Sequence, residues 1–170
     1  MKNLTRTSSS TVQTIVSTAI IAAMYVAVTM VIQPIAYGPI QVRLSEMFNY
    51  LVLFKRRYIW GVTLGVFLSN FMSPTWTLDV PIGTVSTLLV LFLVLWLAKF
   101  TSSLKLQFVI VGVVFALSMF TVAGELYFAF KTPFWFSYLT VGVGEALSMA
   151  IGGILIYFVD RKIDIGRFRI

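Results

Sequence analysis

Long apolar runs are the feature that most constrains how this chain folds. Residues 80–98 contain no charged side chain, and residues 135–159 contain a single one, a glutamate. A helix needs about 17–25 predominantly apolar residues to cross the hydrocarbon core of a bilayer. Of the 170 residues, 59% are hydrophobic and 11% are charged, whereas an average soluble domain carries about 25% charged residues. The chain is therefore predicted to be an integral membrane protein.

Clusters of Pro, Gly, Ser and charged residues divide the apolar sequence into helical segments. Six transmembrane helices are expected, at approximately 15–37, 42–54, 58–72, 80–98, 106–129 and 135–159. The second and third are short and would span only some 20–22 Å at about 1.5 Å per residue. The polar connection at 36–42 is then expected below the membrane surface, where it lines a pocket that opens outward. We predict an all-α fold with a single transmembrane domain over residues 1–170.

The distribution of positive charge predicts the orientation. If the segments alternate in direction, only Arg43 and Lys131 fall on one side, and the other cations fall on the opposite side. The latter are Lys2, Arg6, Lys55, Arg56, Arg57, Lys99, Lys105, Arg161, Lys162, Arg167 and Arg169. Because short loops rich in Lys and Arg stay in the cytoplasm, both termini are expected inside the cell. The net charge of +7 then belongs to a face that touches anionic lipid, and no nucleic-acid partner is expected.

The residue types that are absent restrict the chemistry. The chain has no cysteine and no histidine, which removes thiol nucleophiles, Cys or His metal ligands and the usual general base. We expect no catalytic residue, no metal site and no cofactor in this chain, and it has no phosphate-binding loop for ATP. Two other classes stay open: an intramembrane enzyme that uses carboxylates as acid and base, and a structural or assembly protein whose acids only pair helices.

Four of the six acidic residues fall in the outer half of the predicted bundle, namely Glu46, Asp79, Glu125 and Glu145. An ionisable side chain near the bilayer centre costs at least about 2.5–3.5 kcal/mol, so it normally faces a cavity or a partner. Glu145 is the most informative, because it lies about 15 Å into the last helix. Its alternative role is a buried hydrogen bond to a neighbouring helix.

The other acids also have simpler structural explanations. Asp79 stands at the entrance of a helix and would suit an N-cap. Glu46 lies three residues after Arg43 on the same helical face, where the two side chains would pair. Glu125 would pair with Lys131 at the surface.

Aromatic residues gather at the same end, among them Trp76, Trp135 and Tyr138. An interfacial aromatic belt accounts for most of them. Rings beside carboxylates also suit a flat heterocycle, because the rings stack on its faces while the carboxylates accept hydrogen bonds from N–H groups. With four acids and two cations, the outer half should favour a ligand that is rich in donors or positively charged.

The first helix carries a stripe of small residues at Ala19, Ala23 and Ala27, on which another helix can approach closely. The stretches GVTLG (61–65) and GVGEA (142–146) repeat this spacing, which more often serves packing within one chain. The chain looks small for a self-sufficient transporter built from repeats, so a pocket without an energy source would need a partner.

Four stretches together resemble the QueT family, the queuosine-precursor substrate-binding (S) components of energy-coupling factor (ECF) transporters. They are QVRLSEMFNYL (41–51), WGVTLGVFLSNFMSP (60–74), LDVPIGTVSTLL (78–89) and PFWFSYLTVGVGEALSMAIGG (133–153). The resemblance covers nearly all of the chain. It implies a six-helix S component in the cell membrane of a prokaryote, which captures its ligand from outside. It also implies docking on a transmembrane coupling subunit with two ATPase subunits that use ATP, through Ala19, Ala23 and Ala27.

The implied ligand fits the pocket chemistry. A 7-deazaguanine base offers an N1–H and an exocyclic amine side by side, and one carboxylate can accept both hydrogen bonds. Glu145 is the first candidate for this role and Glu46 the second, while Asp79 or Glu125 would hold the ammonium of an aminomethyl precursor. Further candidates are Arg43, Asn49 and Asn70 as polar contacts, and Trp76, Trp135 and Tyr138 as stacking rings. Another vitamin or small heterocycle stays open as the ligand, because S components of similar design carry different ones.

Overall fold

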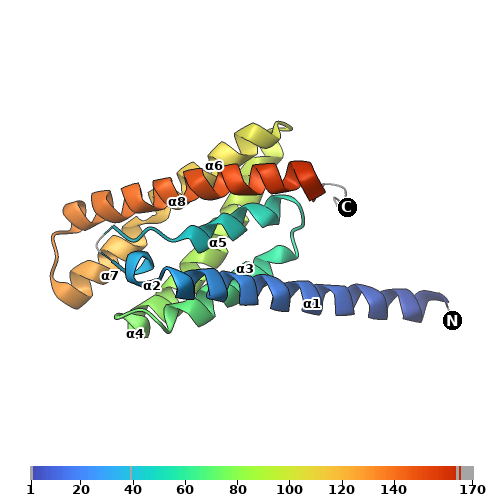
Figure 1. Ribbon diagram of the computed structural model, residues 1–170, viewed down its shortest axis with the longest axis horizontal. Helices are drawn as coiled ribbons and strands as arrows, with labels where there is room; N and C mark the ends of the chain where they lie inside the picture. Colours follow the sequence, from blue (N-terminus) through green and yellow to red (C-terminus); the bar gives the residue numbers. More distant parts are fainter. Residues whose placement is uncertain (1, 39, 164, 166–170) are drawn as a thin grey trace.

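The computed structural model describes residues 2–38, 40–163 and 165 of the chain, with the side chains from residue 11 onward. All regular secondary structure in this part is helical (Figure 1). The helices are α1 (Lys2–Val31), α2 (Gln33–Ala36), η1 (Leu44–Leu53), α3 (Tyr58–Asn70), α4 (Trp76–Leu78), η2 (Asp79–Gly83), α5 (Thr84–Leu97), η3 (Ala98–Phe100), α6 (Leu104–Ser118), α7 (Phe120–Phe130) and α8 (Phe134–Ile163). Arg167 and Arg169 lie outside the described residues, as do the side chains of Lys2 and Arg6.

Four helical stretches in the described part are long and apolar enough to cross a membrane. They are Thr11–Val31, Trp76–Phe100, Leu104–Phe130 and Phe134–Ile163. The chain is thus an all-α, multi-pass membrane protein, as predicted. The other two expected segments, at 42–54 and 58–72, form the shorter helices η1 and α3.

The first helix begins earlier than the apolar pattern does. Helix α1 starts at Lys2, whereas the sequence predicts a start at residue 15. It ends at Val31, and the single turn of α2 follows with Pro34 near its start. Proline has no backbone N–H to continue the hydrogen-bond ladder, so the helix is interrupted there. Figure 1 shows the N-terminal part of α1 extending beyond the bundle, at the end where α8 finishes.

The second predicted segment is the 3₁₀ helix η1, which lies at the centre of the bundle. It contacts α1, α3, α5, α6 and α8. A 3₁₀ helix rises about 2.0 Å per residue, so its ten residues span about 20 Å, the length expected for this segment as an α-helix. Side chains at i and i+3 eclipse one another in a 3₁₀ helix. This geometry places Glu46 directly beside Asn49.

Two of the long stretches are interrupted where sequence patterning predicts continuous helices. The stretch Trp76–Phe100 contains the π-helix η2, in which Pro81 removes one backbone donor. The stretch Leu104–Phe130 breaks at Met119 between α6 and α7. At this break the Ser118 hydroxyl donates to the Phe115 carbonyl (2.7 Å) and the Thr121 hydroxyl to the Ser118 carbonyl (3.0 Å). Hydroxyl groups that bond to helix carbonyls in this way favour bends.

Small residues let the central helices approach closely. Helix α3 packs on α1 with Gly61 against Ile21 and Gly65 against Tyr25, so the GVTLG stretch serves packing within the chain. On α8, a second stripe of small residues packs against η1 and against the segment before it. There Gly144 faces the backbone of Ile40, and Gly152 faces Met47.

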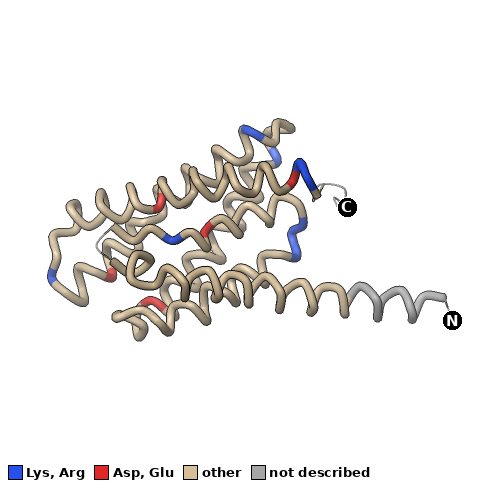
Figure 2. The backbone as a smooth tube through the Cα atoms, in the orientation of Figure 1, with Lys and Arg blue, Asp and Glu red and all other residues tan. Residues whose placement is uncertain are grey.

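The charges are segregated along the bundle (Figure 2). We call one end the basic end, defined by Lys55, Arg56, Arg57, Lys99, Lys105, Arg161 and Lys162. The acidic half is the part that carries Glu46, Asp79, Glu125 and Glu145. Figure 2 shows the cations concentrated where α8 ends, with most of the acidic residues farther along the bundle.

Replacing Gly65 with alanine should destabilise the bundle. The added Cβ would lie 2.6 Å from the Tyr25 Cβ, and overpacking of this kind costs about 1–3 kcal/mol. The matched control is Gly124→Ala in α7, where an added Cβ meets no atom within 4 Å. Thermal unfolding of the detergent-purified protein should show a lower midpoint for Gly65→Ala alone. Equal midpoints for the two variants would contradict the close α1–α3 packing.

Candidate functional site

A small polar cavity lies in the acidic half, between η1, α3, η2, α5, α6 and α7. Its volume is about 30 Å³, which is enough for about one or two water molecules. The polar residues that line it are Arg43, Glu46, Asn70, Ser86, Thr87, Ser118 and Thr121. Each irregular helical element contributes to the lining: η1 through Glu46, η2 through Gly83, and the α6–α7 break through Met119. The departures from regular helix therefore converge on one place.

Glu46 is buried, and both of its carboxylate oxygens accept hydrogen bonds. The Tyr25 hydroxyl of α1 donates to Oε1 at 2.6 Å. The Asn49 side chain donates to Oε2, which the eclipsed geometry of the 3₁₀ helix allows. Next to them, the hydroxyls of Ser45 and Thr29 lie 2.7 Å apart. Because a buried carboxylate is costly unless it is hydrogen-bonded, this network fixes the position of Glu46.

Arg43 is held at the start of η1 by groups other than Glu46. Its Nε donates to the Ala36 carbonyl (3.2 Å) and its Nη2 to the Gln41 side chain (3.0 Å). Its guanidinium carbon lies 5.0 Å from the centre of the Tyr37 ring, a cation–π distance. Gln41 adopts a left-handed backbone conformation with φ 54°. The side-chain hydrogen bonds of Arg43 and Glu46 therefore do not support the simple ion pair considered from the sequence.

Asp79 and Glu125 lie beside each other across the η2–α7 contact. The Asp79 carboxylate accepts hydrogen bonds from the hydroxyls of Ser73 and Thr75, the latter at 2.8 Å. It therefore binds side-chain hydroxyls and forms no side-chain cap at the helix start. Glu125 is only 4% exposed, whereas Lys131 lies 6.0 Å from the centre of the Tyr127 ring. Because Glu125 is buried, the structure does not support the surface pair with Lys131 that was considered from the sequence.

Glu145 is one of two buried acids that have an oxygen without a hydrogen-bond donor in the described part of the chain. It is 2% exposed, and its Oε1 accepts no hydrogen bond from the described residues. The charges of Glu46 and Arg43 are close enough to act on its carboxylate, although Glu145 does not line the small cavity itself. Within the described part, Asn49 Oδ1 and Glu125 Oε1 are likewise buried without a donor. Since most buried polar atoms are paired, these three acceptors mark the cluster as a candidate binding site.

The remaining predicted residues fall into two groups. Asn70 lines the cavity and donates to the Asp79 carbonyl at 2.7 Å. Trp76 and Trp135 are 50% and 72% exposed, and the Tyr138 hydroxyl donates to the Leu117 carbonyl at 3.2 Å. The structure thus places Asn70 with the acids, leaves Trp76 and Trp135 on the outside of the bundle, and half-buries Tyr138.

Sequence reasoning missed several residues that complete the site. Tyr25 binds Glu46, Ser73 and Thr75 bind Asp79, and Phe115 supplies an aromatic wall to the cavity. A tyrosine in the middle of the apolar run AAMYVAV (22–28) was an available signal, because a buried hydroxyl needs a partner. The sequence gives no comparable signal for Phe115, because its place in the cavity wall depends on the helix break at Met119.

Replacing Tyr25 with phenylalanine should destabilise the protein. The variant leaves Glu46 Oε1 without its 2.6 Å donor, and the loss should be about 1–2 kcal/mol. The control is Tyr138→Phe, which removes a hydroxyl that bonds to a carbonyl at an exposed position. Denaturant or thermal unfolding in detergent should show a clear loss for Tyr25→Phe and a smaller one for the control. A larger loss in the control would refute the structural importance of the Tyr25–Glu46 bond.

Comparison with known proteins identifies relatives that cover most of the chain. The family model described as the QueT transporter matches residues 15–161. The queuosine precursor transporter QueT of Lactococcus lactis subsp. cremoris (strain MG1363) is 41% identical over 162 residues, which cover 90% of this chain and 95% of that protein. No solved structure matches the chain.

Proposed function

Because the chain belongs to the QueT transporter family, we propose that it binds and imports a queuosine precursor of the 7-deazaguanine type. In this proposal it is the substrate-binding subunit of an ECF importer. The L. lactis relative is named for transport of a queuosine precursor. The region that matches the family model, residues 15–161, includes Glu46, Asp79, Glu125 and Glu145. Membership in a family of transporters excludes the intramembrane-enzyme hypothesis.

The proposed topology follows from the helices and the charge distribution. All six predicted segments cross or enter the cell membrane of a prokaryote, with residues 1–170 acting as one transmembrane domain and both termini in the cytoplasm. The cations concentrate at the end of the bundle where α8 finishes (Figure 2), which supports a cytoplasmic location for that end. The acidic half then faces outward, where the substrate arrives.

The observation that carries the substrate proposal is the unpaired Oε1 of Glu145. A carboxylate at this position accepts the N1–H and the exocyclic amine of a deazaguanine together, which is a strong, charge-assisted geometry. Glu46 already has a donor on each oxygen. We therefore assign Glu145 the role of anchor, and Glu46 the role of a neighbour that adds negative charge.

A second carboxyl would hold the ammonium group of an aminomethyl precursor. Glu125 is the better candidate than Asp79, because Glu125 Oε1 has no donor in the described part of the chain and Asp79 is bonded to two hydroxyls. Asn49, whose Oδ1 is also unpaired, would accept a further hydrogen bond from the base. The acids thus divide into positions with free acceptor capacity and positions that are already satisfied.

The cavity has a volume of about 30 Å³, and neither Glu145 nor Glu125 is among the described residues that line it. It must therefore enlarge, and extend to these two carboxylates, to admit a bicyclic base. The π-helix η2 and the break at Met119 lie in its wall. Interrupted helices are typical of binding sites inside transporters, and irregular turns need fewer broken hydrogen bonds to shift than continuous helix does. We propose that movement of α7 and of η2 opens the site.

Energy for import would come from partner subunits, because this chain has no phosphate-binding loop. The proposed partners are a transmembrane coupling subunit and two ATPases. Ala19, Ala23 and Ala27 are exposed on α1, while Ile21 and Tyr25 of the same helix are buried against α3. The alanine stripe is therefore available to a helix outside the chain, and we propose that it contacts the coupling subunit.

The Glu145→Gln variant should bind the precursor about tenfold to a hundredfold more weakly, because it loses a charge-assisted pair of hydrogen bonds. The measurement is calorimetric titration of the detergent-purified chain with aminomethyl and cyano deazaguanines. Calorimetry suits this chain because Trp60, Trp76, Trp96 and Trp135 are all at least half exposed.

The control for this titration is Asp160→Asn, the same chemical change at the basic end. It should bind as the unchanged protein does. Saturable binding of a vitamin in place of a deazaguanine would keep the transporter assignment and reject the substrate. A Glu145→Gln protein that binds the deazaguanine with undiminished affinity would reject the anchor. Absence of any binding by folded protein would favour the structural or assembly alternative.

The Ala23→Trp variant should abolish transport while leaving precursor binding intact, because a large side chain prevents close approach of another helix to the stripe. Ala129→Trp on α7 is the matched control, since Ala129 is also exposed but lies outside the stripe. Uptake of labelled precursor in cells and co-purification with the coupling subunit measure the effect. Equal uptake by the two variants would argue against the stripe as the contact surface.

A further inference from the structure

Two neighbouring cavities open at the basic end, far from the acidic cluster. One has a volume of about 720 Å³ and is lined by the segment 52–57 together with the end of α5 and the turn that follows it. The other has a volume of about 340 Å³ and lies between α3 and α5. The two share Arg56, Arg57, Leu95 and Lys99 in their walls. The two cavities therefore adjoin each other, and together we call them the basic groove.

The polar part of the groove is strongly positive. Lys55, Arg56, Arg57 and Lys99 line it, and no Asp or Glu is among the described residues that do so. Arg57 Nε is buried and makes no hydrogen bond within the described part of the chain. The pKa of Lys55 is lowered, first by partial burial and then by the positive charge of Arg57. An anion would relieve this repulsion and supply the missing acceptor.

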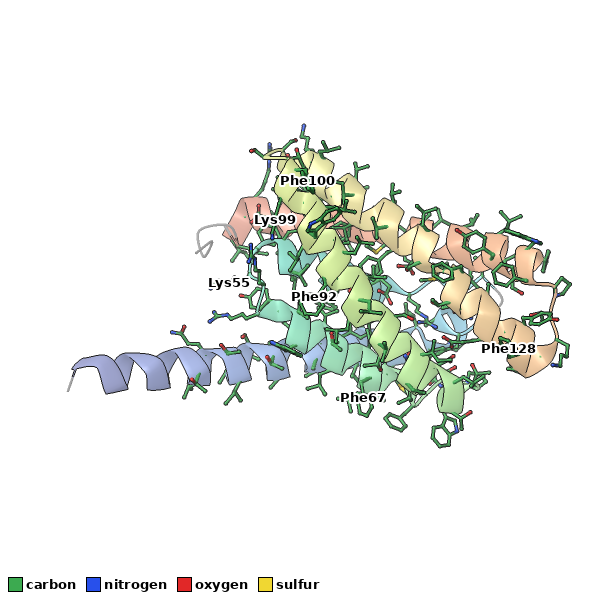
Figure 3. The ribbon with its side chains drawn as sticks, turned by 180° about the vertical axis from the view of Figure 1, so that it is seen from behind. Lys55, Phe67, Phe92, Lys99, Phe100 and Phe128 are labelled. Carbon is green, nitrogen blue, oxygen red and sulfur yellow. The ribbon has the colours of Figure 1, made fainter. Side chains whose placement is uncertain are left out.

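The groove continues into an apolar wall. Trp60 of α3 and Phe92 and Trp96 of α5 line the smaller cavity, and they are 55%, 49% and 54% exposed. Figure 3 shows Lys55 and Lys99 at one end of the bundle, with Phe92 farther along α5. Tryptophan and phenylalanine here suit contact with acyl chains, with the tryptophans at the level of the lipid head groups. A charged surface thus adjoins an apolar one, as the head group of a lipid adjoins its acyl chains.

We propose that the basic groove binds one anionic phospholipid. Its phosphate-bearing head group lies among Arg56, Arg57 and Lys99, and one acyl chain lies along Trp60, Phe92 and Trp96. Basic pockets between transmembrane helices on the cytoplasmic side bind anionic head groups, and arginine pairs with phosphate through two parallel hydrogen bonds. A free phosphate ion would use the cations but leave the aromatic wall exposed, which favours a lipid.

Native mass spectrometry of the detergent-solubilised chain tests this proposal. The probes are dioleoyl-phosphatidylglycerol and dioleoyl-phosphatidylcholine, which share acyl chains and differ in head-group charge. We expect selective retention of phosphatidylglycerol. The triple variant Arg56→Gln/Arg57→Gln/Lys99→Gln should bind it about tenfold to a hundredfold more weakly.

The matched control is Lys105→Gln/Arg161→Gln/Lys162→Gln, which removes the same charge from the basic end but spares the groove. It should retain phosphatidylglycerol as the unchanged protein does, and circular dichroism of both triple variants should show intact helices. Equal loss in the two triple variants would overturn the proposal, since it would indicate a diffuse charge effect. Displacement of the lipid by millimolar inorganic phosphate alone would also overturn it, in favour of a soluble anion. Neither readout involves the transported precursor.

Discussion

The carboxylate of Glu46 is buried at the centre of the bundle, and the surrounding structure is arranged so that it has donors there. The Tyr25 hydroxyl reaches it from α1 and the Asn49 amide from the next turn of η1. Tyr25 can approach only because Gly65 of α3 leaves space beside its ring. A buried carboxylate without these donors would cost several kcal/mol. The mutual positions of α1, η1 and α3 therefore depend on this one group.

The same centre explains why the helices are irregular. A 3₁₀ helix, a π-helix and a helix break surround a cavity lined with hydroxyl, amide and charged side chains. Inside a membrane, irregular backbone is tolerated where it is buried in protein or lines a cavity. Here the hydroxyls of Ser118 and Thr121 bond to carbonyls next to the break. The polar cluster and the irregular backbone thus support each other.

The two ends of the bundle present opposite chemistry to different neighbours. In the acidic half, Glu145 and Glu125 hold acceptors that have no donor among the described residues, which suits a substrate rich in N–H groups. At the basic end, the Nε of Arg57 has no acceptor in the part of the chain that the structure describes, which suits an anion. These hydrogen-bonding groups of opposite kind are the basis of the two proposals, a substrate bound in the acidic half and an anionic lipid bound at the basic end.

Hydrophobicity is a local property, so the sequence alone determined that the chain is a helical membrane protein and where most of its helices lie. The presence of four acids in an apolar chain also identified the candidate site. Only the tertiary structure separated Glu46, which has a donor on each oxygen, from Glu145, whose Oε1 has none among the described residues. That difference depends on residues far apart in sequence, such as Tyr25, which lies 21 positions before Glu46. The form of η1 and the break at Met119 were likewise decided by packing and by local hydrogen bonds, which hydrophobic periodicity does not encode.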